Sequence, residues 1–123
     1  MSAAQTVLII DDSPMIRKLV RMALGCEGFN VLEAEGGHAA LDMVSDCAPD
    51  LVLQDMILPD ISGTELVRRI RALPSCAKIP ILALSGFSSM LSVAENRLLG
   101  FTDVLSKPIE PSRLVSVVKS HLP

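Results

Sequence analysis

Short apolar runs alternate with stretches of helical periodicity along the chain. The runs are residues 7–11 (VLIID), 29–34 (FNVLEA), 51–55 (LVLQD), 81–85 (ILALS) and 103–107 (DVLSK). Apolar runs separated by helical segments are typical of βα repeats, which build a parallel sheet with helices on both faces. The pattern therefore predicts an α/β fold with five strands.

The helical segments carry an apolar face at intervals of three and four residues. The first is the clearest, and its apolar positions are Ile16, Leu19, Val20 and Ala23. Ser13 suits the N-cap of this helix and Pro14 suits its first position. The other predicted helices span residues 37–47, 62–73, 89–99 and 111–121. Because βαβ crossovers are right-handed, these elements predict an open twisted sheet.

Length and composition indicate one domain with a substantial core. The chain has 123 residues, of which 50% are hydrophobic, enough to bury a core without disulfides or metal. Three widely spaced cysteines, Cys26, Cys47 and Cys76, form no metal-binding or disulfide pattern. We expect them to be small buried or half-buried residues.

Charge and hydropathy exclude some functions. A formal net charge of −3 and only three Phe, with no Tyr or Trp, argue against direct nucleic-acid binding. No segment approaches the roughly 18 apolar residues that a membrane span needs, and residues 1–6 do not resemble a signal peptide. We therefore expect no membrane insertion and a cytoplasmic location.

Polar residues stand where four of the strands end. They are Asp11 and Asp12, Asp55, Ser85, and Lys107. The carboxyl ends of parallel strands lie along one edge of the sheet, where ligands bind, so these side chains should converge. Asp and Ser also follow strands simply as helix caps and turn formers. That alternative explains Asp55 and Lys107 poorly, because apolar residues follow both.

Adjacent carboxylates repel each other, so a positive charge must offset them. A carboxylate cluster without imidazole or thiolate is a hard oxygen site that suits Mg²⁺ or Mn²⁺. Mg²⁺ fills its remaining positions with water and phosphate oxygens. The sequence thus predicts a metal site prepared for a phosphoryl group, with Lys107 as a further positive charge.

The order and spacing of these motifs resemble the receiver domain of two-component response regulators. The motifs are the acidic pair, DMILPDISG from Asp55 to Gly63, Ser85-Gly86, and Lys107-Pro108. The resemblance runs from Val7 to about His121 and implies a single receiver domain over residues 1–123. It implies a three-layer flavodoxin-like (βα)5 sandwich, with a five-stranded parallel sheet in the order 2-1-3-4-5.

The resemblance also implies a role for each metal-site residue. Asp12 would bind Mg²⁺ directly, with Mn²⁺ as a substitute, and Asp11 would bind it largely through water. Asp55 and the backbone carbonyl of Ile57 would complete the protein ligands.

The same resemblance assigns the phosphoryl chemistry. Asp55 would be the phosphoacceptor, attacking the phosphohistidine of a sensor histidine kinase or a histidine phosphotransfer domain. Lys107 would neutralise the phosphoryl oxygens, and Ser85 would donate a hydrogen bond and move inward. The Lys107-Pro108 peptide bond would be cis. No small-molecule turnover is expected, so the domain would not be an enzyme in that sense.

Phosphorylation would switch the surface of the fourth helix, fifth strand and fifth helix, where a downstream protein or domain would bind. Many receivers place an aromatic residue three positions before the lysine, but here that residue is Val104. The common aromatic readout is therefore not expected. The apolar Ile57 and Phe87 border the expected phosphoryl position, and we hypothesise that they hinder hydrolysis.

Three other functions compete with this interpretation. A degenerate receiver would bind a protein partner without phosphorylation. A metal-dependent aspartyl-phosphate phosphatase would need a second carboxylate two residues after Asp55, where Ile57 stands. A nucleotide-binding module would need a glycine-rich loop where the chain has DDSPM. The chain would be a stand-alone regulator or the receiver of a larger protein such as a hybrid sensor kinase.

The remaining charged residues are expected to be structural. We interpret Asp50, Asp60 and Asp103 as turn or surface residues, and His38 and His121 as surface residues. Arg68, Arg69 and Arg71 are expected to form a solvated helix face.

Overall fold

A computed structural model describes residues 4–86 and 92–123 of the chain. The strands are β1 (Thr6–Ile10), β2 (Asn30–Ala34), β3 (Leu51–Asp55), β4 (Ile81–Ser85) and β5 (Asp103–Ser106). The helices are α1 (Pro14–Gly25), α2 (Gly37–Cys47), α3 (Gly63–Arg71), the short 3₁₀ helix η1 (Pro74–Cys76), α4 (Val93–Leu99) and α5 (Pro111–His121).

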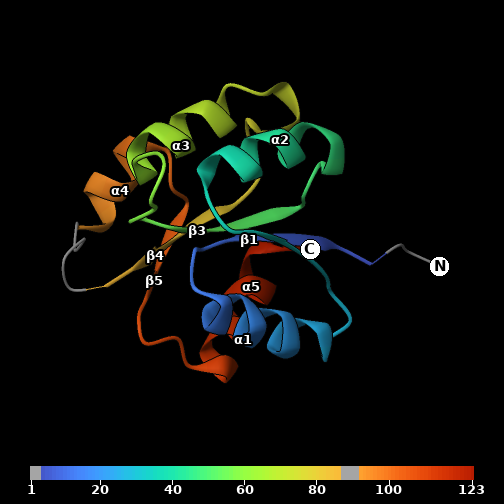
Figure 1. Cartoon of the computed structure of the whole chain (residues 1–123). Coiled ribbons are helices and arrows are strands. Elements are labelled where there is room, and N and C mark those ends of the chain that lie inside the picture. The colour runs from blue at the N-terminus through green and yellow to red at the C-terminus, as the bar shows by residue number, and fades with distance from the viewer. Residues whose placement is uncertain (1–3, 87–91) are drawn as a thin grey trace.

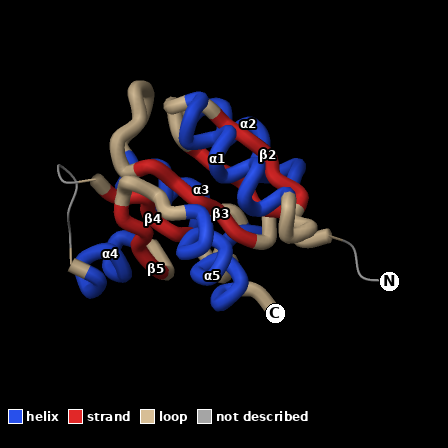
Figure 2. Tube along the Cα trace, turned by 90° about the horizontal axis from the view of Figure 1, so that it is seen from below, coloured by secondary structure: helices blue, strands red, loops and turns tan. Residues whose placement is uncertain are grey.

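The five strands form one parallel sheet in the order β2-β1-β3-β4-β5. Helices α1 and α5 cover one face, and α2, α3 and α4 cover the other (Figure 1). Seen from below, β2 with α2 and β5 with α4 lie at opposite ends of the molecule (Figure 2). This architecture confirms the predicted three-layer fold and its strand order.

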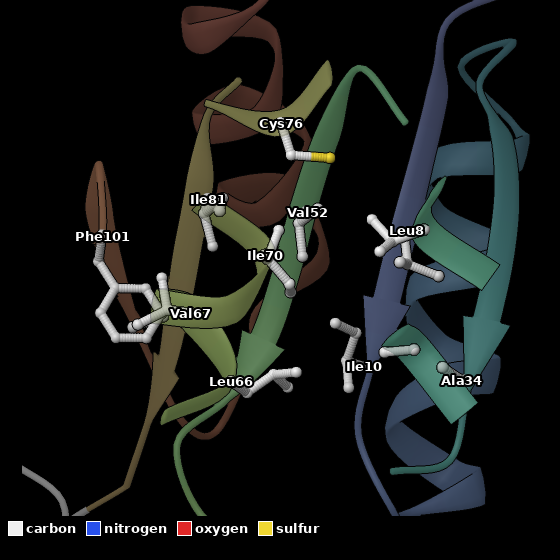
Figure 3. Close-up of a cluster of buried hydrophobic side chains, with 13 residues drawn as sticks. Leu8, Ile10, Ala34, Val52, Leu66, Val67, Ile70, Cys76, Ile81 and Phe101 are labelled. Carbon is white, nitrogen blue, oxygen red and sulfur yellow. The ribbon is translucent and has the colours of Figure 1, made fainter. Parts of the chain in front are cut away.

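Alternation along the strands creates a separate core on each face of the sheet. Leu8, Val52 and Ile81 point to the face of α2 and α3, where they pack with Leu66 and Ile70 (Figure 3). The intervening strand residues pack against α1 and α5 and include Val7, Ile9, Leu51, Leu53, Leu82, Leu84 and Leu105. Burial on both faces explains why these strands are almost continuously apolar.

The predicted helices are found with two changes at their ends. Ser13 caps α1 as expected, because its Oγ accepts the Ile16 N–H at 3.3 Å. The third helix ends at Arg71, short of the predicted residue 73. Leu73 takes an extended backbone before Pro74, where proline disfavours the helical conformation. The fourth helix begins at Val93 after the N-cap Ser92, later than the predicted residue 89, because the Ser92 side chain accepts the Glu95 N–H. Residues 87–91, which include Phe87, lie outside the described residues.

Two surface expectations are wrong. Cys26 is exposed, whereas Cys76 is buried and Cys47 is intermediate. Arg71 is half-buried and not part of a solvated face. Its guanidinium donates to five oxygens: the carbonyls of Gly100, Cys76, Ala77 and Ile79, and Thr102 Oγ1. Arg71 therefore joins α3 to the segments before β4 and β5.

None of the helices within residues 4–86 and 92–123 is long and apolar enough to cross a bilayer.

Candidate functional site

Backbone hydrogen bonds extend the sheet just past the ends of its strands and hold the site residues in place. The Asp11 N–H donates to the Ala34 carbonyl at 3.1 Å. At the other end of the same edge, the Lys107 N–H donates to the Ser85 carbonyl at 2.8 Å. The polar residues predicted to converge are thus carried by a rigid edge.

Three carboxylates meet at this edge. One oxygen from each of Asp11, Asp12 and Asp55 lies within 4.8 Å of the others. Asp11 is fully buried and Asp55 is 7% exposed, whereas Asp12 is exposed. The repulsion predicted from the sequence is therefore present in a partly desolvated site.

Lys107 reaches across the sheet to two of these carboxylates. Its Nζ lies 3.0 Å from Asp11 Oδ2 and 3.2 Å from Asp55 Oδ2. The peptide bond that follows, Lys107-Pro108, is cis, as the resemblance implied. One ammonium group against three carboxylates leaves the cluster with a net negative charge.

These contacts shift the pKa values of Asp55 and Lys107. Burial raises the pKa of Asp55 and the charge of Asp11 raises it further, against the opposing effects of the Ile57 N–H and Lys107. Burial alone would lower the pKa of Lys107, but its hydrogen bond to Asp11 and the charges of both carboxylates raise it above its ordinary value. Lys107 is therefore a cation at neutral pH.

Asp11, the first residue of the acidic pair, is oriented by contacts with the start of α1. Asp11 Oδ1 accepts the Ser13 N–H at 2.9 Å. The Arg17 guanidinium donates to the Asp11 backbone carbonyl at 2.8 Å and pairs with Glu33 of β2 at 3.3 Å. The sequence pattern did not predict these contacts of Arg17, because they join α1 to β2 and to a backbone carbonyl.

The loop after β3 is joined to the phosphoacceptor candidate itself. The Ile57 N–H donates to Asp55 Oδ1 at 3.3 Å. The Ile57 side chain is 57% exposed, which is unusual for a large apolar residue beside a charged site. The metal role of its backbone carbonyl stays a prediction.

Ser85 ends β4 with a 7% exposed side chain. Its Oγ donates to the Gly86 carbonyl at 3.3 Å. Since β4 pairs with β3 and β5, Ser85 stands on the strand between those that carry Asp55 and Lys107. The structure therefore brings all five predicted side chains to one edge of the sheet.

The donor set suits a hard divalent cation. The described residues of the cluster provide carboxylate oxygens and no sulfur or imidazole nitrogen, which favours Mg²⁺ or Mn²⁺ over zinc. The excess negative charge supplies the electrostatic attraction.

Sequence reasoning missed a contact between the β3–α3 loop and α2. Asp60 accepts the backbone N–H groups of Gly37 at 3.0 Å and His38 at 2.9 Å. These hydrogen bonds lower the pKa of Asp60. With Asp12, Glu35 and His38, Asp60 also lines a surface cavity of about 410 Å³. Asp60 is thus a helix cap supplied by a distant loop, as well as a surface residue.

Comparison with known proteins shows the family of the chain. The model of the response regulator receiver domain matches residues 7–119. The phosphate regulon transcriptional regulatory protein PhoB of Pseudomonas aeruginosa is 36% identical over 118 residues, covering 96% of this chain and 52% of PhoB. The polar-differentiation response regulator DivK of Brucella anthropi is 30% identical over 118 residues, covering 96% of each chain.

A solved structure shows the same fold. The chemotaxis response regulator CheY4 of Vibrio cholerae is 29% identical, with a TM-score of 0.88 over 97% of this chain and 99% of the CheY4 chain. The present chain therefore spans about half of PhoB and nearly all of DivK and CheY4. The protein belongs to the response regulator receiver domain family of two-component signalling.

Proposed function

We propose that the domain accepts a phosphoryl group on Asp55 from a phosphohistidine of a sensor histidine kinase or a histidine phosphotransfer domain. The observation that carries the proposal is the position of the Asp55 carboxylate. It is nearly buried, 3.2 Å from the Lys107 ammonium, and clustered with two further carboxylates. An isolated surface aspartate would have none of these features.

In the proposed reaction, an Asp55 oxygen forms a bond to phosphorus while the phosphorus–nitrogen bond of the donor breaks. The departing imidazole nitrogen regains its electron pair, so the step needs no oxidant or reductant. Lys107 holds a positive charge beside the oxygen that attacks, where it stabilises the charge that spreads over the phosphoryl oxygens. Ser85, which follows the register partner of Asp55 on β4, would donate a hydrogen bond to the product.

Asp11, Asp12 and Asp55, with the carbonyl of Ile57, would hold Mg²⁺. When bound, the ion would supply positive charge that offsets carboxylate repulsion and neutralises phosphoryl oxygens. The Ser13 N–H and Arg17 contacts fix Asp11 before any ion arrives. Asp11 would therefore need little rearrangement.

Exposed apolar side chains beside the site offer the donor a docking surface. Met15, at the start of α1, is 81% exposed, and Ile57 is 57% exposed. Side chains of this type are common at the centres of protein interfaces. The donor would cover them when it brings its histidine to Asp55.

The output surface would be formed by α4, β5 and α5. Leu98 of α4 is 89% exposed, and His121 of α5 lies 2.9 Å from Asp103 of β5. Movement of Ser85 after phosphorylation would reach this surface through β4, and a downstream protein or domain would bind it. Val104 supports a readout without an aromatic side chain. We further propose that the domain acts in the cytoplasm.

The proposal is tested by incubating the protein with Mg²⁺ and acetyl phosphate and measuring its intact mass. The mass should rise by one phosphoryl group, and EDTA or the Asp55→Asn substitution should abolish the rise. If wild type takes up no phosphoryl group, the domain is a degenerate receiver that binds partners without phosphorylation. Continuous release of phosphate from small phosphate esters would instead support a phosphatase.

A further inference from the structure

Gln54 is a polar residue in the middle of an apolar environment, directly before Asp55. It is fully buried, and its register partners on the neighbouring strands are Ile10 and Ala83. Within residues 4–86 and 92–123, Gln54 Oε1 is the only buried side-chain nitrogen or oxygen without a hydrogen-bond partner. A buried unpaired carbonyl destabilises a fold, so stability alone does not explain Gln54.

The other end of the Gln54 amide makes a specific contact. Nε2 donates to the backbone carbonyl of Gly63 at 2.7 Å. Gly63 is the first residue of α3, and residues 56–62 form the loop between the two partners. The Gln54 side chain therefore closes this loop at its base.

Close backbone packing surrounds this contact. A Cβ atom on Gly63 would lie 2.6 Å from the Met56 carbonyl oxygen, so α3 begins directly against the first loop residue. The Met56 N–H donates to the Leu84 carbonyl at 3.2 Å, which holds Met56 to β4. A shift of Gly63 would therefore move Met56, and with it Ile57, which is the next residue in the chain.

We infer that Gln54 is a positioning residue for the metal and phosphoryl site. Its amide holds the start of α3 against Met56, and this contact fixes the direction of the Ile57 carbonyl relative to the Asp55 carboxylate. The inference rests on the proposed function, because it concerns the same cation site. By this inference, Gln54 strengthens Mg²⁺ binding although its unpaired buried oxygen lowers the stability of the fold.

Gln54→Met tests the inference, since methionine has a similar length, fills the apolar space and cannot donate to Gly63. We expect the midpoint of urea unfolding in EDTA to be unchanged or higher. The Kd for Mg²⁺ without phosphodonor, measured by amide NMR shifts, should rise about tenfold, as for other residues that orient metal ligands. A rise of about threefold or more supports the inference, and a smaller change overturns it.

Val52→Ala is the matched control. Val52 lies two residues earlier on the same face of β3 and is fully buried, but its apolar side chain has no donor for the Gly63 carbonyl. This variant should lose stability and keep the Mg²⁺ affinity of wild type. If it weakens Mg²⁺ binding as much as Gln54→Met does, the effect is a general response to core substitution and the inference is wrong.

A second variant and a hydrogen-exchange measurement also test the role of Gln54. If Gln54→Met does not fold, Gln54→Leu is measured against the same threshold. In metal-free wild type, amide hydrogen exchange in residues 56–62 should be slower than in an unstructured peptide, and exchange at the unstructured rate overturns the inference. If wild type binds no Mg²⁺, the proposed cation site is refuted. If wild type and Gln54→Met bind Mg²⁺ equally well, only the role of Gln54 is refuted.

Discussion

Replacing Asp55 by asparagine should stabilise the metal-free protein, although it removes the ion pair with Lys107. The residue is 7% exposed, and burial and the Asp11 charge raise the pKa of Asp55. The folded state therefore holds the Asp55 charge less favourably than the unfolded state does. Asparagine keeps an oxygen that can accept the Ile57 N–H, and Lys107 keeps its contact with Asp11 at 3.0 Å.

The size of the effect follows from the distances in the cluster. Each carboxylate pair lies within 4.8 Å, so at an effective dielectric constant of about 40 it repels by at least about 1.7 kcal/mol. Asp55 takes part in two such pairs. Its attraction to Lys107 at 3.2 Å is about 2.6 kcal/mol on the same scale. The difference, with the cost of burying the charge, predicts a gain of about 1 kcal/mol in the free energy of unfolding.

Urea unfolding followed by circular dichroism in EDTA at low ionic strength measures this gain, which corresponds to a Tm higher by about 4 °C. Because the folded-state pKa of Asp55 is raised, wild type loses stability as the pH rises through that pKa. The difference in the free energy of unfolding between Asp55→Asn and wild type should therefore be largest at neutral pH. It should disappear in acid, where Asp55 is protonated in both the folded and the unfolded state. Mg²⁺ should narrow this difference by stabilising wild type.

Asp50→Asn is the control for this prediction. Asp50 accepts the Thr6 N–H at 2.7 Å at the opposite edge of the sheet, so its substitution should give no stabilisation. If Asp55→Asn is no more stable than wild type in EDTA at neutral pH, the electrostatic description of the site is wrong.

Three further predictions concern the framework of the site, each measured by urea unfolding. Asp60→Ala removes the cap of α2 and should cost about 1 kcal/mol, with a smaller loss for Asp60→Asn; equal stability of wild type and the alanine variant would contradict the capping role. Gly63→Ala forces a methyl group against Met56 and should cost about 2 kcal/mol; a neutral effect would mean that α3 can shift freely. Arg71→Met leaves several carbonyls without their donor and should also cost about 2 kcal/mol; no loss would show that water replaces the guanidinium.

The sequence predicted those parts of the fold that depend on local pattern. Strands β3 and β4 and helices α2 and α5 occupy the predicted residues, because each apolar run or helical face is complete within its own segment. Convergence of the site residues was also predictable, since it follows from parallel strands that end together. The sequence shows that Gln54 is a polar residue within an apolar strand, but it does not predict that its side-chain oxygen is unpaired.

Contacts between distant segments could not be predicted in the same way. Asp60 stands just before the start of α3, so the local sequence suggests a turn residue. In the structure it instead caps α2, where it accepts the N–H of His38, 22 residues earlier in the chain. Arg71 follows two exposed arginines, and only the packing of α3 beside the segments before β4 and β5 turns it inward. Both side chains satisfy backbone groups whose positions are set by the tertiary structure.

The most direct test of Asp55 as the phosphoacceptor is to locate the phosphoryl group chemically. The protein is phosphorylated by a phosphohistidine donor with Mg²⁺, reduced with borohydride, digested and sequenced by mass spectrometry. An acylphosphate at Asp55 is reduced to homoserine, so we predict homoserine at position 55 and unmodified Asp11 and Asp12. Homoserine at another position, or none in a protein that has taken up phosphate, would contradict the assignment of Asp55 as the phosphoacceptor.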